Sequence, residues 1–191
     1  AVAESSEEFM ERYFSGESFT EEEIYSALRE QVATGDMAPV MMGSGVNAQG
    51  ANALMNAIVR YFPSPERAAR DSGVDLTTGE HFVANYKPDV NLSMKVFKTI
   101  ADPFIGKYSL VKVLTGVLRA DSELFNTGKE VEEKSGKIYV LRGKEAIEVS
   151  ELRPGDIGAM AKLNETETGD TLARKQAPIL YNAPQISKPY T

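Results

Sequence analysis

The chain has 191 residues, 42% hydrophobic and 26% charged, which is typical of a globular protein of one medium domain or two small ones. It contains no cysteine, which excludes disulfides, thiolate metal sites and a cysteine nucleophile and is the usage expected of a cytoplasmic protein. A net charge of −7 argues against a surface coated for nucleic acid, and no apolar run is long enough to cross a bilayer, so we expect no membrane partner.

Helical signals fill the first third of the sequence. Ser5 and Glu8 have the spacing of a capping box, and Thr20 and Glu23 repeat it. Gly35 stands where a glycine commonly ends a helix. We therefore predict two helices here. The apolar stripe expected to bury the second consists of Ile24, Leu28 and Val32.

A strand, a glycine turn and a third helix follow. The run from Ala38 to Met42 is apolar without alternation, which is typical of a strand buried on both faces of a parallel sheet. Gly43-Ser44-Gly45 interrupts it, and a helix then runs from Gly50 until Pro63. These elements form half of a βαβ unit whose other strands are missing from the sequence, so we expect the strand to promote self-association. The apolar stripe of the helix consists of Leu54, Ile58 and Phe62.

The pattern changes after residue 65. Residues 66–93 are polar and rich in turn signals, and we interpret them as a linker that crosses the surface. Residues 94–175 contain short alternating strands separated by turns, such as Val111 to Val117 and Ile157 to Leu163. Short strands at this spacing without helices predict a closed antiparallel barrel. The expected fold class is α+β, with a helical and α/β first part followed by an antiparallel β-barrel.

Few residues carry recognisable chemistry. The turn at Ser44 and Gly45 lies between a buried strand and a helix, where doubly wound sheets bind ligands and where backbone amides can donate to a base or a phosphate. No Gly-x-x-x-x-Gly-Lys-Ser/Thr loop occurs, and His81 is the only histidine. The missing loop excludes a phosphate cradle of that type, and a single histidine excludes a multi-histidine metal site. The adjacent Glu132 and Glu133 are expected to serve capping and solubility.

Basic residues are concentrated in the second part. Residues 1–93 carry 6 Lys and Arg against 15 Asp and Glu, whereas residues 94–175 carry 14 against 13. We expect most of these cations to face outward and to protect strand edges. A subset at one rim of the barrel can neutralise RNA phosphates. The candidates for that contact are Lys107, Arg119, Arg142 and Arg153.

The order of these segments resembles elongation factor G and its relatives. Residues 8–17 (EFMERYFSGE) look like the helical stretch after the subdomain inserted in the family's G domain, and residues 38–45 (APVMMGSG) look like the strand leading to its last guanine-contacting motif. Residues 97–107 (FKTIADPFIGK) and 168–172 (TGDTL) are similar to domain II, and Ala183-Pro184 onward resembles the crossing into domain III. The family's motif usually has Ser-Ala where this chain has Ser44-Gly45.

The resemblance implies a parent that binds GTP and Mg²⁺, hydrolyses GTP on the ribosome and promotes translocation. It implies a C-terminal end of a G domain in residues 1–65, a linker in 66–93, the domain II barrel in 94–175 and the start of the connection to domain III in 176–191. Ser44 and Gly45 would contact guanine in that parent, and the four basic candidates would contact small-subunit ribosomal RNA. The barrel would also couple to the G domain. Because the phosphate-binding loop is absent, we expect this chain alone to be no enzyme and to bind neither GTP nor Mg²⁺.

Two alternatives remain open. A ribosomal protection protein or a release-factor relative shares the barrel motifs of this family. Outside the family, the chain would be a free-standing barrel that serves as an interaction module, with the helices as its cap. An unpaired apolar strand at residues 39–42 disfavours this second alternative, since a self-sufficient cap would not contain one.

Overall fold

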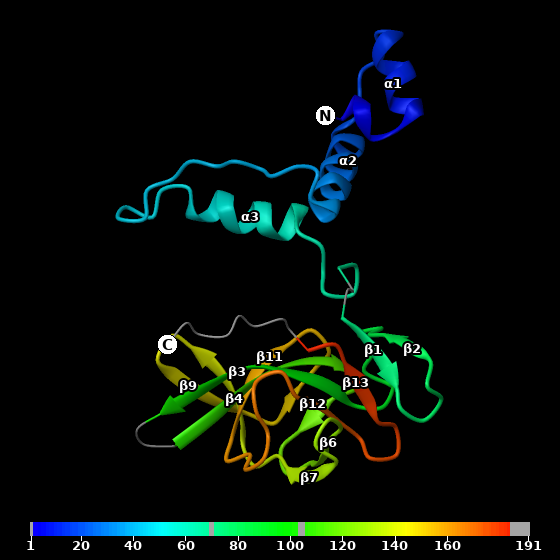
Figure 1. Cartoon of the computed structure of the whole chain (residues 1–191). Coiled ribbons are helices and arrows are strands. Elements are labelled where there is room, and N and C mark those ends of the chain that lie inside the picture. The colour runs from blue at the N-terminus through cyan, green and yellow to red at the C-terminus, as the bar shows by residue number, and fades with distance from the viewer. Residues whose placement is uncertain (1, 69–70, 103–105, 184–191) are drawn as a thin grey trace, which may run out of the picture. The chain divides into compact units, whose positions relative to one another are not determined.

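The computed structural model describes residues 2–68, 71–102 and 106–183. The chain divides into two compact units, Ala1–Ala68 and Ala69–Thr191, hereafter unit 1 and unit 2. The described part of unit 1 is helical, and that of unit 2 consists of mainly antiparallel strands (Figure 1). The helices of unit 1 are η1 (Ala3–Ser5), α1 (Glu7–Phe14), α2 (Glu21–Thr34) and α3 (Ala51–Tyr61).

Local capping explains where the first helices begin and end. The Ser6 hydroxyl accepts a hydrogen bond from the Phe9 amide, so α1 begins one residue later than expected. Thr20 and Glu23 form the predicted capping box, because each side chain accepts from the other's backbone amide at 3.3 and 2.8 Å. Gly35 ends α2 with φ 87°, a left-handed conformation that favours glycine.

Arg12 holds α1 against the start of α2. Its guanidinium contacts both carboxylate oxygens of Glu23, at 2.6 and 3.2 Å, and lies over the rings of Phe9 and Phe19. The hydrogen bond from Arg12 is the main reason why the pKa of Glu23 is lowered to about 2.

The buried strand predicted at residues 38–42 is wrong. Val40 and Met42 are 90% and 95% exposed, and the described part of unit 1 contains only an isolated bridge between Ser44 and Gln49. An extended segment without neighbours has no partner with which to exchange backbone hydrogen bonds. The apolar stripe of α3 is also exposed, because no other element in the described part of unit 1 covers these side chains. Its predicted members Leu54, Ile58 and Phe62 are 48%, 41% and 53% exposed.

Unit 2 is built from short strands and two long ones, β3 and β4. The strands are β1 (Ser72–Asp75), β2 (His81–Val83), β3 (Ser93–Asp102), β4 (Gly106–Thr115), β5 (Leu118–Arg119), β6 (Glu123–Asn126), β7 (Val131–Lys134), β8 (Ile138–Arg142), β9 (Glu145–Val149), β10 (Glu151–Leu152), β11 (Ile157–Ala161), β12 (Thr171–Ala173) and β13 (Ile179–Tyr181).

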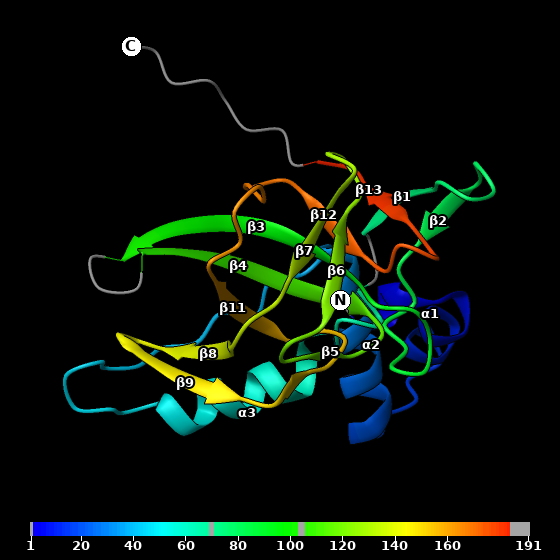
Figure 2. The same ribbon diagram turned by 90° about the horizontal axis from the view of Figure 1, so that it is seen from below.

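Most of these strands belong to one antiparallel sheet. Its order is β7-β6-β12-β3-β4-β11-β8-β9, and a separate pair joins β10 to β5. Figure 2 shows β3 and β4 side by side along most of their length, as their register requires. The main core lies on one face of this sheet and consists of Leu92, Met94, Val96, Val111, Val113, Leu118, Leu124, Ile138, Leu152, Met160, Leu163 and Leu172.

The side chains of β11 that were expected to face the main core lie on the other face of the sheet, where there is a second buried cluster. Ala159 and Ala161 pack with Tyr108 and Leu110 on the other face of the sheet, while Met160 enters the main core. Ile157, predicted to face inward, is 56% exposed. The middle of β11 is buried on both faces, so the alternation of apolar residues in the sequence does not indicate which face packs into the main core.

The linker predicted at residues 66–93 contains a hairpin instead of a plain connection. β1 pairs with β2 and also with β13, so the sheet order is β13-β1-β2. Phe82 and Tyr181 pack with the inner cluster of this small sheet. The predicted connection at residues 176–191 therefore begins with a strand of unit 2. Strands of three and four residues among turn-forming residues are too short to show alternation.

Part of the motif-bearing sequence lies outside the described residues. This applies to Pro103, Phe104 and Ile105 in the ADPFIG motif and to Pro184 onward. Among the helices that the structure does describe, none is both long and apolar enough to cross a membrane.

Candidate functional site

The turn at Ser44 and Gly45 is closed by its own hydrogen bonds. The Ser44 amide donates to the Gln49 carbonyl at 2.9 Å, and the Ser44 hydroxyl accepts from the Asn47 amide at 3.4 Å. A Cβ at Gly43 would lie 2.7 Å from the Gln49 oxygen, so this tight closure requires glycine there. Since the Ser44 amide is already used, the predicted base contact of this turn would fall to the Gly45 amide.

A hollow of about 340 Å³ lies beside this turn. Its walls are mainly backbone and aliphatic side chains, so it offers few polar partners to a ligand. Lining residues include Met41, Met42, Ala48, Gln49 and Leu54.

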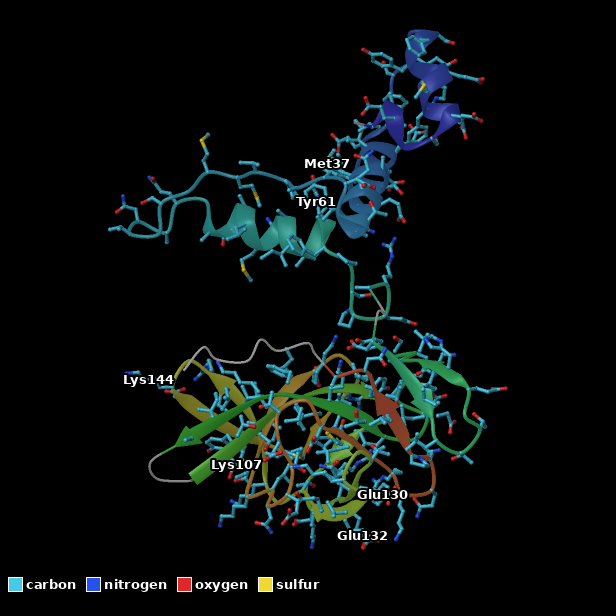
Figure 3. The ribbon with its side chains drawn as sticks, in the orientation of Figure 1. Met37, Tyr61, Lys107, Glu130, Glu132 and Lys144 are labelled. Carbon is cyan, nitrogen blue, oxygen red and sulfur yellow. The ribbon has the colours of Figure 1, made fainter. Side chains whose placement is uncertain are left out.

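Lys107 does not point freely into solvent. It lies at the start of β4, and its ammonium donates to the backbone carbonyl of Thr166 (Figure 3). This side chain therefore holds a loop of its own unit, and an RNA phosphate would have to displace that carbonyl.

Arg119 and Arg153 are brought together by one carboxylate. Glu151 forms an ion pair with each of them, with nitrogen–oxygen distances of 3.5 Å to Arg119 and 2.9 Å to Arg153. Both arginine side chains are 67% exposed. Exposed ion pairs of this kind contribute roughly 0–1 kcal/mol, so the guanidinium groups can exchange Glu151 for another anion at little cost.

Arg142 belongs to a different part of the surface. It pairs with Glu145 at 2.8 Å across the turn of the β8–β9 hairpin, where Lys144 extends outward (Figure 3). The structure thus joins only Arg119 and Arg153 among the four predicted cations, and contact with RNA stays a prediction for all four.

A clamp on the loop before β12 was missed by sequence reasoning. The Glu133 carboxylate accepts the successive backbone amides of Asn164, Glu165 and Thr166 at 3.2, 2.9 and 3.0 Å. The Lys129 ammonium donates to the Glu165 carbonyl at 2.5 Å. Together with Lys107, these side chains hold the loop by both its amides and its carbonyls.

The two neighbouring glutamates of β7 therefore have different partners. Glu132 is exposed and pairs with Lys175 at 2.6 Å, which lowers the pKa of Glu132. Only Glu133 holds the loop, and neither lies at a helix start. Alternation along a strand is the signal that could have separated them, because adjacent strand residues point to opposite faces.

A second missed feature is the ionic cluster around Asp71. Its carboxylate contacts the ammonium groups of Lys112 and Lys95 at 2.9 and 3.5 Å and accepts the Tyr86 hydroxyl at 2.8 Å. Burial by itself raises the pKa of Asp71, but the hydrogen bonds from Lys112 and Tyr86 outweigh it and the pKa is lowered. Asp71 thereby fixes the beginning of unit 2 to β3 and β4.

The family model that matches this antiparallel sheet is elongation factor G domain 2, and the match covers residues 91–175. Unit 2 therefore contains a module similar to domain 2 of elongation factor G. A crystal structure of a protein from Thermus thermophilus is similar to the chain as a whole, with a TM-score of 0.70 and 26% identity. That likeness covers 93% of this chain and 24% of the Thermus chain, so this chain spans about a quarter of the length of its relative.

Proposed function

We propose that these residues work within a ribosome-binding translational GTPase that promotes translocation in protein synthesis. In this proposal unit 2 contacts the small ribosomal subunit and couples to a G domain, of which unit 1 is the end. The observation that carries it is the match of residues 91–175 to elongation factor G domain 2. The likeness to the Thermus chain supports it further, because its 93% coverage extends into unit 1.

We also propose that the sheet of unit 2 closes into a barrel. Leu124 lies on β6, near one end of the strand order, and Ile138 lies on β8, near the other end. Both belong to the same buried cluster, together with Leu152 of the β10–β5 pair. A flat sheet would keep such strands far apart, whereas a curled sheet brings their inner faces together.

Arg119 and Arg153 are the residues we propose for phosphate contact. They are exposed and converge on Glu151, which a phosphate can replace, whereas Lys107 is used inside the unit. Each phosphate neutralised by a cation releases counterions, so binding should weaken as salt rises, with a slope of about −0.7 to −0.9 per contact.

Binding of the chain to isolated small ribosomal subunits tests this function. We expect salt-dependent binding, and the double variant Arg119→Ala/Arg153→Ala should reduce both the affinity and the salt slope. Lys175→Ala is the matched control, because Lys175 is an exposed, ion-paired cation of the same unit at another place. Absence of binding, or equal losses in both variants, would refute the proposed contact.

We propose in addition that the apolar surface of unit 1 associates with copies of itself in concentrated solution. Val40, Met42 and Val59 are 90%, 95% and 82% exposed, and apolar surface of this kind favours association. Sedimentation should show mass rising with concentration, and Val59→Lys should reduce the effect. A monomer at every concentration would contradict this proposal.

A further inference from the structure

Three lysines lie on the face of the main sheet that is opposite the main core, hereafter the outer face. Lys98 is the register partner of Leu110, which packs in the second buried cluster on that face. Lys112 is two residues from Leu110 and therefore points to the same side, as does its own register partner Lys95. The three lysines form one patch, hereafter the lysine patch.

A β-bulge brings Lys98 to this face. Lys95 and Lys98 are three positions apart, so in a regular strand they would point to opposite faces. The register of β3 shifts between Val96 and Lys98, where Phe97 has no register partner. Val96 before the shift is in the main core, whereas Lys98 after it is on the outer face. Bulges that redirect a side chain in this way are common next to functional sites.

Protection of a strand edge does not explain the lysine patch. β3 and β4 lie in the middle of the strand order, between β12 and β11 (Figure 2). Lysines blunt exposed edges, but these two strands are paired on both sides. Like charges directly opposite each other destabilise a sheet, so the pairing of Lys95 with Lys112 is by itself unfavourable for the fold.

The lysine patch keeps a positive charge after its internal pairing. Asp71 contacts both Lys95 and Lys112, but one carboxylate offsets only one of the three ammonium groups. Lys98 is exposed and forms no ion pair with any residue that the structure describes. The side chains of Lys95 and Lys112 are 19% and 33% exposed, so a ligand can reach them from solvent. Such a surface attracts a polyanion.

Exposed apolar side chains border the lysine patch. Phe97, in the bulge beside Lys98, is 41% exposed, and Ile157, the register partner of Lys112, is 56% exposed. Proteins that bind unpaired nucleic acid combine cations for the phosphates with aromatic side chains on which bases stack. Charge attracts any polyanion, and the exposed ring beside it favours one that carries flat bases.

We propose that the lysine patch binds an unpaired strand of RNA, with phosphates on Lys95, Lys98 and Lys112 and a base stacked on Phe97. The choice of RNA among polyanions rests on the function proposed above, because a protein that binds the ribosome is surrounded by RNA. Loops and bulges of folded RNA supply unpaired strands of this kind. Asp71 then competes with the phosphates, because it holds two of the same ammonium groups.

Fluorescence anisotropy with the full chain and a labelled uridine oligonucleotide of about ten nucleotides tests this site. We expect binding at low salt. Lys98→Ala should lower the affinity about fivefold or more and reduce the salt slope by about 0.7, the contribution of one phosphate contact on a single strand. Lys134→Ala is the matched control and should change neither. Lys134 is also an exposed lysine of a strand, and no residue that the structure describes forms an ion pair with it.

Two further variants test the remaining parts of the site. Phe97→Ala should weaken binding about fivefold or more, because it removes a stacked base. Asp71→Asn should strengthen binding roughly fivefold at a temperature where the variant is folded, because one unit charge about 4 Å away has an effect of that order even in water. Asp89→Asn changes the net charge equally at an exposed position and should strengthen binding less.

Equal effects of Lys98→Ala and Lys134→Ala would overturn the lysine patch, as would absence of oligonucleotide binding at low salt. Equal binding of a duplex, or no loss in Phe97→Ala, would overturn the unpaired strand. Displacement of the oligonucleotide by polyglutamate as readily as by unlabelled RNA would refute RNA as the ligand. If Asp71→Asn does not fold, the Lys98→Ala comparison decides.

Binding to small ribosomal subunits tells a failure of this site from a failure of the proposed function. Chains that bind the subunits but not the oligonucleotide would refute the lysine patch alone. Chains that bind the oligonucleotide through Lys98 but not the subunits would refute the proposed function and support the patch.

Discussion

The hydroxyl groups of Ser93 and Tyr181 lie 2.7 Å apart inside unit 2, although 88 positions separate them in the sequence. Ser93 is also 2.6 Å from the Thr115 hydroxyl, which donates to the Asn91 carbonyl. This buried chain of hydroxyls ties β13 to β3 and β4. It explains why the small sheet belongs to unit 2, although the strands of that sheet lie outside residues 94–175, the range expected for the barrel.

Tyr181→Phe should therefore lower the free energy of unfolding of unit 2. Removing one hydroxyl leaves a buried partner unsatisfied, at a cost of roughly 1–2 kcal/mol. Denaturant unfolding followed by a unit 2 signal measures the loss. Tyr139→Phe is the control, because the Tyr139 hydroxyl has no hydrogen bond within the part of the chain described, and equal effects of both changes would contradict the prediction.

Alkaline pH should weaken unit 2 through the same tyrosine. Burial raises the pKa of Tyr181 to about 12, whereas an unfolded tyrosine ionises near 10. Between these values the unfolded state loses the proton first, so stability is complete below about pH 10 and falls as pH rises toward about 12, by at most roughly 1.4 kcal/mol per pH unit. In Tyr181→Phe, the part of the loss in the free energy of unfolding that comes from this tyrosine should be absent. Parallel pH profiles for the two proteins would refute it.

Asp71→Asn should also destabilise unit 2, at neutral pH. Lys112 and Lys95 would lose their shared carboxylate, and hydrogen bonds to charged groups contribute roughly 1.5–3 kcal/mol. Because the pKa of Asp71 is lowered on folding, its contribution is present above the ordinary carboxyl pKa and is lost as pH falls through the lowered value. The variant should thus differ from wild type at pH 7 and approach it in acid. Asp89→Asn, at an exposed position, should change unfolding little at any pH.

Glu133→Gln should loosen the loop before β12 without unfolding the unit. Hydrogen exchange at the amides of Asn164, Glu165 and Thr166 should accelerate, since the acceptor of all three loses its charge. The neighbouring Glu132→Gln removes only an exposed ion pair with Lys175 and should leave these amides unchanged. Equal exchange in the two variants would show that the carboxylate does not hold the loop.

Local signals were sufficient to predict the helices. The capping box at Thr20 and the glycine at position 35 act within one turn of the chain, and the structure confirms both. The strand expected at Pro39 to Met42 depends on neighbours that lie elsewhere, and the described residues supply none. The sequence already lacked those neighbours, but the apolar run was still interpreted as a buried strand.

The site was less predictable because its contacts are long-range. Their positive charge made Lys107 and Arg119 equal candidates for contact with RNA. In the structure, however, Lys107 is bound to the Thr166 carbonyl, whereas Arg119 is exposed beside Glu151. The roles of Asp71 and Glu133 depend on partners that are distant in the sequence, 41 positions away in the case of Asp71 and Lys112. Composition and spacing carry no information on such pairing.

The last prediction is that this chain, by itself, does not measurably bind or hydrolyse GTP. Affinity for a nucleoside triphosphate comes largely from phosphate contacts made by a glycine-rich loop, a lysine and a held magnesium ion. The sequence contains no such loop, and in the turn at Ser44 the serine amide is already bonded to the Gln49 carbonyl. What remains for a base is essentially the Gly45 amide, and a hydrogen bond contributes only about 0.5–1.5 kcal/mol net. Loss of rigid-body freedom costs roughly 4 kcal/mol or more, so the dissociation constant should be millimolar or weaker.

Calorimetric titration with GTP and Mg²⁺ measures this dissociation constant, and Gly45→Pro is the control that removes the remaining amide donor. A micromolar constant that Gly45→Pro abolishes would show that this turn binds the nucleotide without a phosphate loop.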